Sequence, residues 1–154
     1  MKIVLFRPQI PQNTGNIVRT CAVTGTELIL VTPLGFSTSN RMLKRAGLDY
    51  WEGVTVTFID DLEAYLDQTM HPFFFFSSKA TQSYTSCTYT ENCILIFGSE
   101  TDGLSPLYRE KWPEKFLTIP MKKKSRCLNL SNTASIVIYE ALRQQGFPFA
   151  HALV

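Results

Sequence analysis

Three polar segments of the chain carry the side chains that could do chemistry. Residues 12–20 read QNTGNIVRT, residues 98–105 read GSETDGLS, and residues 120–132 read PMKKKSRCLNLSN. Each lies soon after a short apolar run that reads as a strand. In parallel α/β sheets, ligands bind beyond the carboxyl ends of the strands. We therefore expect a binding or catalytic site in these segments.

The segment GSETDGLS combines backbone freedom with negative charge. Gly98 and Gly103 permit close backbone approach or a positive φ, and Glu100 supplies a carboxylate. No lysine follows, so the pattern of a phosphate-binding loop is absent. The segment suits a ligand that carries a cation or hydroxyls, such as a sulfonium or a ribose. The alternative is a plain turn that leads to a helix N-cap at Ser105–Pro106.

The segment QNTGNIVRT places two polar side chains on one side of an expected helix. Asn16 and Arg19 are three residues apart, so they are neighbours on the helix face opposite the apolar stripe. A guanidinium group can bind a phosphate through two hydrogen bonds. A solvated surface arginine is the alternative, and spacing alone favours it.

Cationic side chains gather in two places, although the formal net charge is only +2. The two groups are Lys122, Lys123, Lys124 and Arg126, and Arg41, Lys44 and Arg45. Such groups are commonly solvated surface, but they can also bind an anionic partner. The first group precedes asparagines and a serine that either cap the last helix or close over a ligand.

Several kinds of site and location are not expected. The four cysteines, Cys21, Cys87, Cys93 and Cys127, form no CxxC pair and lie far from both histidines, so no metal site is predicted. Cys21 and Cys93 fall in apolar runs and read as core thiols. We see neither a secretory signal nor a membrane span, and we expect a cytoplasmic protein with reduced thiols.

The elements that must position these segments alternate between strand and helix. The expected strands are 2–6, 27–32, 54–58, 73–77, 93–97 and 116–120. The expected helices run from Asn13 or Thr14 to a stop at Gly25, then over 38–46, 60–68 and 131–145. Apolar strands between helices indicate an α/β fold with a mostly parallel sheet flanked by helices. The polar segment 78–92 is expected to be a mobile loop, and residues 1–154 to form one domain.

Together the three segments resemble the signature motifs of the SPOUT superfamily of RNA methyltransferases. The matching stretches are NTGNIVR, ILIFGSETDGL and IPMKKKSRCLNLSNTASIVIYEAL, in the family's order and spacing over nearly the whole chain. The short chain, with no added RNA-binding domain, is similar to the minimal tRNA wobble-position 2′-O-methyltransferases. The stretches RAGLDYWEGV and LRQQGFPFA also resemble that subgroup.

The resemblance implies a fold, a cofactor and a reaction. The fold would contain a deep C-terminal trefoil knot, a rare exception to the rule against knots. The cofactor would be S-adenosyl-L-methionine (AdoMet), and the protein would act as a homodimer whose active sites borrow from both subunits. The substrate would be the ribose 2′-hydroxyl of the wobble nucleotide, cytidine or modified uridine, in the tRNA anticodon loop. A non-catalytic RNA-binding module and a methyltransferase of another RNA, such as rRNA, are the alternatives.

The resemblance also assigns residues to three roles. The catalytic set is Arg19, Asn16, Glu100 and Asn129. The cofactor-binding set is Phe76, Gly98, Gly103, Ile119, Met121, Cys127, Leu128 and Ser131. The RNA-binding set is Arg7, Arg41, Lys44, Arg45, Lys122, Lys123, Lys124 and Arg126.

The chemistry limits what the catalytic side chains can do. The 2′-hydroxyl must lose its proton while it attacks the sulfonium methyl in line, so positioning supplies much of the rate. Arg19 is almost never neutral, which favours an orienting role over a role as base. Asn16 would hold Arg19, and Glu100 and Asn129 would complete a polar ring around the methyl group. Many relatives carry serine in place of Cys127, which matters only if that side chain, and not its backbone, binds the cofactor.

Overall fold

The computed structural model describes residues 1–37, 53–123 and 125–149. The expected helix over 38–46 lies outside the described residues. So do four cationic residues of the RNA-binding set, Arg41, Lys44, Arg45 and Lys124.

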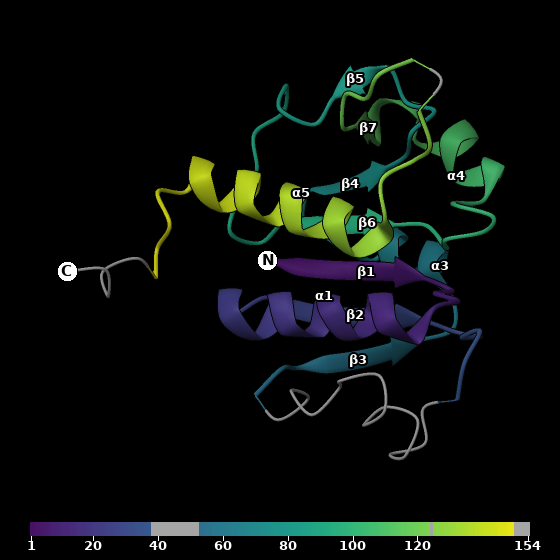
Figure 1. Cartoon of the computed structure of the whole chain (residues 1–154), viewed down its shortest axis with the longest axis horizontal. Helices are drawn as coiled ribbons and strands as arrows, with labels where there is room; N and C mark the ends of the chain where they lie inside the picture. Colours follow the sequence, from purple (N-terminus) through teal and green to yellow (C-terminus); the bar gives the residue numbers. More distant parts are fainter. Residues whose placement is uncertain (38–52, 124, 150–154) are drawn as a thin grey trace.

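The described part of the chain builds one sheet of seven parallel strands in the order β3-β2-β1-β6-β4-β7-β5 (Figure 1). The strands are β1 (Lys2–Phe6), β2 (Glu27–Val31), β3 (Val56–Ile59), β4 (Phe73–Phe76), β5 (Gln82–Ser83), β6 (Ile94–Phe97) and β7 (Phe116–Thr118). Each neighbouring pair is parallel; Val4 of β1, for example, lies beside Ile29 of β2 and Ile96 of β6. The predicted α/β fold with a parallel sheet is confirmed, and the trefoil knot stays a prediction.

Helices cover both faces of this sheet. They are α1 (Pro11–Thr24), α3 (Leu62–Asp67), α4 (Pro106–Lys111) and α5 (Leu130–Gln144), with a 3₁₀ turn over Pro113–Lys115. Figure 1 shows α1 and α5 side by side over one face, where the hydroxyls of Thr20 and Ser135 lie 3.2 Å apart. None of the helices within the described residues is long and apolar enough to cross a membrane.

The core follows from the alternation of side chains along each strand. In β1, Ile3 and Leu5 pack in one buried cluster with residues of α1 and α5, and Val4 packs in a second cluster with Leu62 of α3 and Tyr108 of α4. Successive strand residues point to opposite faces of a sheet, so a strand with helices on both sides must be apolar throughout. The apolar runs of the sequence reflect this burial on both faces.

The cysteines expected in the core are there. Cys21 lies in α1 and is buried, and Cys93 is buried just before β6. Burial disfavours the thiolate and raises the pKa of Cys21 to about 12 and that of Cys93 to about 11. Neither thiol is therefore a reactive nucleophile near neutral pH.

The first helix starts earlier than predicted. Its first residue is Pro11, and the N-cap residue Ile10 makes no side-chain capping bond. The prediction that Asn13 or Thr14 caps this helix is wrong, because proline is well suited to the first helical position. The predicted stop is confirmed, since Gly25 has φ of +66° and its N–H bonds the carbonyl of Cys21.

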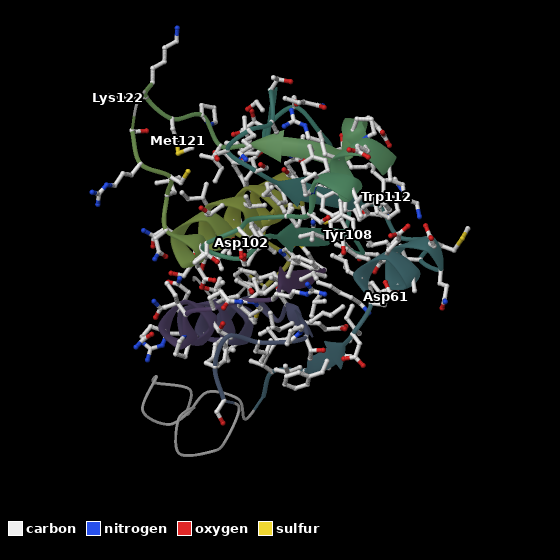
Figure 2. All side chains as sticks on the ribbon, turned by 90° about the vertical axis from the view of Figure 1, so that its right-hand side faces the viewer. Asp61, Asp102, Tyr108, Trp112, Met121 and Lys122 are labelled. Atoms are coloured by element: carbon white, nitrogen blue, oxygen red, sulfur yellow. The ribbon has the colours of Figure 1, made fainter. Side chains whose placement is uncertain are left out.

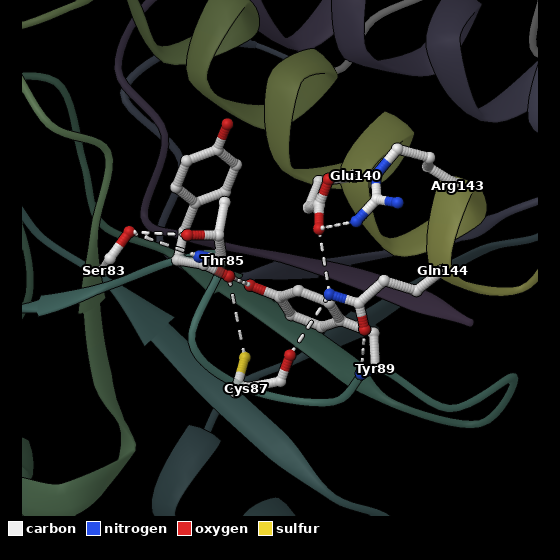
Figure 3. A network of polar contacts seen from close by, with 8 residues as sticks. Ser83, Thr85, Cys87, Tyr89, Glu140, Arg143 and Gln144 are labelled. Carbon is white, nitrogen blue, oxygen red and sulfur yellow. Dashed lines mark hydrogen bonds and ion pairs between the residues drawn. The ribbon is translucent and has the colours of Figure 1, made fainter.

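Residues 78–92 differ from the expected mobile loop. They include β5, which pairs with β7, and the Tyr89 side chain is only 3% exposed. Gln144 of α5 accepts a hydrogen bond from the Tyr89 N–H at 3.0 Å and donates one to the Cys87 carbonyl at 3.2 Å (Figure 3). One buried aromatic ring and one amide side chain therefore anchor this polar segment to the last helix.

Candidate functional site

A cavity of about 480 Å³ opens at the edge of the sheet where the strands end. Its lining comes from the loops that follow β1, β4, β6 and β7, and from the start of α5. Figure 2 looks onto this edge. Because β1, β6, β4 and β7 are neighbours in a parallel sheet, their carboxyl ends lie together. The three polar segments of the sequence therefore converge on one hollow, whose size is typical of a small-molecule site.

Two glycines hold the turn after β6 in a closed form. Ser99 and Gly103 exchange backbone hydrogen bonds of 3.1 and 3.0 Å, and Gly103 has φ of +70°. A Cβ atom on Gly98 would lie 2.3 Å from the carbonyl carbon of Gly103, far inside contact distance. The turn also leads into α4, whose N-cap Ser105 accepts a hydrogen bond from the Leu107 N–H. Cavity wall and helix cap thus occur in the same segment.

Glu100 reaches from this turn to the start of the first helix. Its carboxylate accepts hydrogen bonds from the backbone N–H groups of Gln9 at 2.8 Å and Ile10 at 3.2 Å, and from the side-chain amide of Asn13 at 2.9 Å. A helix N-terminus has unpaired N–H donors and a partial positive charge, both of which favour a carboxylate. Glu100 therefore caps α1 from a distant part of the chain in the way that the glutamate of a capping box does, by bonding the N–H of the N-cap residue Ile10, and it also bonds that of Gln9 before it.

Asn129 caps the last helix, α5. Its side-chain oxygen accepts hydrogen bonds from the Ser131 N–H at 2.8 Å and the Ser131 hydroxyl at 2.7 Å. Its amide nitrogen donates to the side-chain oxygen of Asn13 at 2.9 Å. Asn13, which is 5% exposed, thus links Glu100 to Asn129 and joins the starts of α1 and α5 at the cavity wall.

Most residues of the predicted cofactor-binding set lie around this cavity. The lining includes Phe76, Gly98, Gly103, Ile119, Met121, Cys127 and Leu128. Ser131 is buried behind Asn129 and is not part of the lining. Of the predicted catalytic set, Glu100 and Asn129 line the cavity. The roles assigned to these residues stay predictions.

The other two predicted catalytic residues lie elsewhere. Asn16 and Arg19 are exposed on α1, as their spacing predicted, and neither lines the cavity of its own chain. The site of one chain, as the structure describes it, is therefore formed without Arg19.

The described cationic residues of the predicted RNA-binding set lie outside the cavity lining. Lys122, Lys123 and Arg126 are exposed on the segment between Met121 and Cys127, which both contribute to the lining. Figure 2 shows the Lys122 side chain extending away from the ribbon. Arg7 follows β1 with φ of +50°, and its guanidinium carbon lies 5.1 Å from the centre of the Phe6 ring.

Sequence reasoning missed two parts of the wall. The sequence patterns present Asn13 only as a local helix cap, and they place Ser78 and Lys79, in the turn after β4, in a segment expected to be a mobile loop. In this turn the Ser78 hydroxyl accepts a weak hydrogen bond from the Cys127 thiol at 3.4 Å. The only available signal was position, since residues 77–79 also follow a strand end. Within the described residues, no group of three or more His, Cys, Asp or Glu side chains could hold a metal ion.

Comparisons with known proteins agree with this geometry. Residues 1–139 match the model of a family described as the SpoU rRNA Methylase family. A relative from Escherichia coli (strain K12), named tRNA (cytidine(34)-2′-O)-methyltransferase, is 43% identical over 152 residues, which cover 97% of each chain.

Two solved structures show how widely the fold is shared. The first, described as giving structural insights into the 2-OH methylation of C/U34 on tRNA, is 39% identical with a TM-score of 0.84, over 94% of this chain and 95% of that chain. The second is the SpoU methyltransferase AviRb from Streptomyces viridochromogenes in complex with the cofactor AdoMet. It is 22% identical with a TM-score of 0.79 over 94% of this chain and 57% of that chain, a likeness of fold.

Proposed function

The chain belongs to the SpoU rRNA methylase family, and from this we infer that it methylates the ribose 2′-hydroxyl of the wobble nucleotide, position 34, in tRNA. The nucleotide is a cytidine or a modified uridine, and the methyl donor is S-adenosylmethionine. One observation carries the proposal: the three polar segments meet at one cavity in a chain that is 43% identical, over nearly its full length, to a tRNA (cytidine(34)-2′-O)-methyltransferase.

The residues present fit AdoMet. The cavity offers apolar side chains such as Phe76, Ile119 and Leu128 for a purine ring, and backbone groups of the glycine turn for polar edges. Glu100 adds negative charge to the lining, which would favour a positively charged sulfonium. A related fold, in AviRb, has been solved with AdoMet. When bound, this cofactor supplies an activated methyl group.

The protein's own residues position the reactants. The Glu100–Asn13–Asn129 chain of hydrogen bonds fixes the cavity wall, so the 2′-hydroxyl meets a preorganised surface. Glu100 has three donors on two oxygens and keeps room for a further hydrogen bond, since a carboxylate offers about four acceptor sites. On methyl transfer, the hydroxyl proton would pass to this polar wall or to water, and S-adenosylhomocysteine would be the second product.

Arg19 is proposed to act in the cavity of a second copy of the chain. Its exposed position outside its own cavity agrees with a site completed across a homodimer. A guanidinium group there orients the hydroxyl or a neighbouring phosphate and stabilises developing negative charge. Asn16, three residues earlier on the same helix face, holds the arginine.

Exposed apolar side chains on α1, α5 and the following residues support the proposed dimer. Val23 is 61% exposed, Tyr139 45% and Phe149 43%, and Ile136 is also exposed. The centre of the Phe147 ring lies 6.5 Å from that of Tyr139 and 6.4 Å from that of Phe149, so the three aromatic rings form one group. Apolar groups gathered on adjacent helices are typical of a protein interface.

The RNA is proposed to bind through Lys122, Lys123 and Arg126 beside the cavity mouth, together with the rest of the predicted cationic set, Arg7, Arg41, Lys44, Arg45 and Lys124. Each phosphate contact releases counterions, so tRNA affinity falls as salt rises. The exposed anticodon loop, with unstacked bases, is the part of tRNA that such a surface can read. A tRNA substrate agrees with action in the cytoplasm.

The test is a methylation assay with tRNA and AdoMet, followed by mass spectrometry of the anticodon-loop nucleosides. We expect 2′-O-methylation at position 34. Arg19→Ala should lower the rate about 100-fold or more, as loss of a transition-state donor does, and leave folding and dimer formation unchanged. Arg109→Ala, an exposed arginine on α4, is the matched control and should retain activity. An unmodified tRNA with the wild-type protein would refute the proposal.

The family description names rRNA, so an rRNA substrate is the second candidate. The same assay with ribosomal RNA in place of tRNA separates the two. The non-catalytic module is tested by a thermal shift with AdoMet, because ligand at 100 times its Kd adds roughly 2.7 kcal/mol of stability. No shift would favour the module.

A further inference from the structure

Among the described residues of the cavity lining, three side chains carry a formal charge: Lys79, Glu100 and Asp102. The Glu100 oxygens already receive hydrogen bonds from Gln9, Ile10 and Asn13. Lys79 makes no ion pair with any residue that the structure describes, and it is the one cationic side chain among the described residues of the lining. Among the residues that the structure describes, this positive charge at the cavity thus has no ion-pair partner.

Backbone contacts fix the place of Lys79. It belongs to the turn after β4, where the Ala80 N–H bonds the Ser77 carbonyl at 3.1 Å and the Lys79 N–H bonds the Ser77 hydroxyl at 3.2 Å. The Cys127 thiol donates to Ser78 in the same turn. The turn is therefore anchored both to itself and to the loop before α5, and the lysine leaves it at the cavity.

The two carboxylates come from a different turn, the one after β6. Asp102 is exposed there; its N–H bonds the Ser99 hydroxyl at 3.1 Å, and its carboxylate accepts from Thr101 at 3.2 Å. The lining thus carries positive charge on the turn after β4 and negative charge on the turn after β6. A ligand that carries both signs of charge can satisfy such a wall, whereas a simple anion or cation cannot.

Other cationic residues, outside the cavity lining, can bind the RNA phosphates, so Lys79 is not needed for that role. Lys122, Lys123 and Arg126 are exposed on the neighbouring segment but do not line the hollow. A phosphate backbone can be held by these residues. Lys79 is itself exposed, but it borders a hollow of small-molecule size, where its ammonium can meet a charged group of the small molecule.

We propose that Lys79 binds the α-carboxylate of the cofactor's methionine moiety. This inference rests on the proposed function. AdoMet carries one anionic group, that carboxylate, and two cationic groups, the α-ammonium and the sulfonium. Lys79 holds the anionic end, and the carboxylates of the turn after β6 face the cationic groups. Lys79 is thereby a residue that selects ligands with an amino-acid tail.

The experiment is isothermal titration with two ligands and three proteins. S-adenosylhomocysteine has the amino-acid tail; decarboxylated AdoMet lacks the carboxylate. The proteins are the wild type, Lys79→Gln and the control Arg109→Gln, which removes an exposed positive charge on α4, outside the cavity. We expect Lys79→Gln to weaken the binding of S-adenosylhomocysteine about fivefold, the effect of an exposed ion pair, and Arg109→Gln to leave it unchanged. Decarboxylated AdoMet should bind wild type and Lys79→Gln alike.

A circular dichroism melt without ligand confirms that the variants are folded, and Lys79→Arg, which keeps the charge, should regain much of the affinity. The inference is overturned if Lys79→Gln binds S-adenosylhomocysteine as the wild type does, or if it weakens both ligands equally. If Lys79→Gln bound S-adenosylhomocysteine normally but bound tRNA more weakly, Lys79 would instead belong to the RNA-binding surface. If the wild type binds neither ligand, the proposed function fails and this inference fails with it.

Discussion

The two helices that start at the cavity, α1 and α5, are capped at their N-termini in different ways. The last helix, α5, is capped by its own Asn129, which bonds the N–H groups of Ser131 and Asn132 two and three residues later. The first helix, α1, has no side-chain cap of its own, and the N–H of its N-cap residue Ile10 bonds Glu100, which lies 90 residues away along the chain. Asn13 then ties the two caps together.

The difference between a local and a distant cap shows which part of the fold the site depends on. A local cap forms whenever its helix forms, but a distant cap forms only when the turn after β6 is in place. The start of α1 and the cavity wall are therefore one structural unit. Changes in that unit should affect stability and ligand binding together, whereas changes elsewhere in α5 should affect stability alone.

The most disruptive change should be Glu100→Ala. It removes a charged acceptor from two backbone N–H groups and the Asn13 amide, so we expect a loss of about 3 kcal/mol in the free energy of unfolding. Denaturant unfolding measures it. Asp102→Ala, from the same turn but exposed, should cost less than about 0.5 kcal/mol. Equal losses in the two variants would show that α1 does not need its distant cap.

Asn13→Ala should come next. It leaves one oxygen of Glu100 and the Asn129 amide without this partner, in a site where Asn13 is buried, and we expect a loss of about 2 kcal/mol. The affinity for S-adenosylhomocysteine should fall in the same variant. Asn16→Ala, on the exposed side of α1, is the matched control for stability. If Asn13→Ala lost stability but kept its full affinity for S-adenosylhomocysteine, the cavity wall would not depend on this hydrogen-bonded link between the caps.

Asn129→Asp sharpens the comparison, because it keeps the local cap and breaks only the link. Aspartate still accepts from the Ser131 and Asn132 N–H groups, but it cannot donate to Asn13. We expect a loss of about 1 kcal/mol by denaturant unfolding. Combined with Asn13→Ala, it should cost less than the sum of the two, and strict additivity would contradict the link.

Glu140→Gln, near the other end of α5, should have the smallest effect. The Arg143 guanidinium, with the Gln144 amide, lowers the pKa of the Glu140 carboxyl from its ordinary value of 4.5 (Figure 3). A lowered pKa stabilises the folded state above the ordinary value, and this contribution is lost as the pH falls through the lowered pKa.

The wild type should therefore be about 0.5 kcal/mol more stable than Glu140→Gln at pH 7, a magnitude that allows for solvent screening. The difference should close as the pH falls below 4.5, while cofactor affinity stays unchanged. Unfolding curves at several pH values measure it. A difference that grew toward acid pH would contradict the assignment.

The sequence predicted what local patterns determine. Buried strands are continuous apolar runs, so the expected strands lie within two residues of those found, and the carboxyl-end rule located the cavity. The last helix was placed within one residue, because Asn129 caps it locally.

Long-range contacts explain what the sequence could not show. The start of α1 was misplaced because the N-cap residue Ile10 has no capping side chain and the carboxylate found there comes from the distant Glu100; Pro11 at the first helical position was the local signal that was missed. The anchoring of Tyr89 by Gln144 and the place of Lys79 in the wall also depend on segments that meet only in the folded sheet.

The distant cap has a consequence for synthesis on the ribosome. Residues emerge in order at roughly 5–20 per second, so the start of α1 is made about 5 to 18 seconds before Glu100. During that interval a helix of 14 residues, lacking a side-chain cap, is only marginally stable in water. The first turn of α1 therefore lacks its cap in the nascent chain until Glu100 has been made. The cavity can form only late in translation.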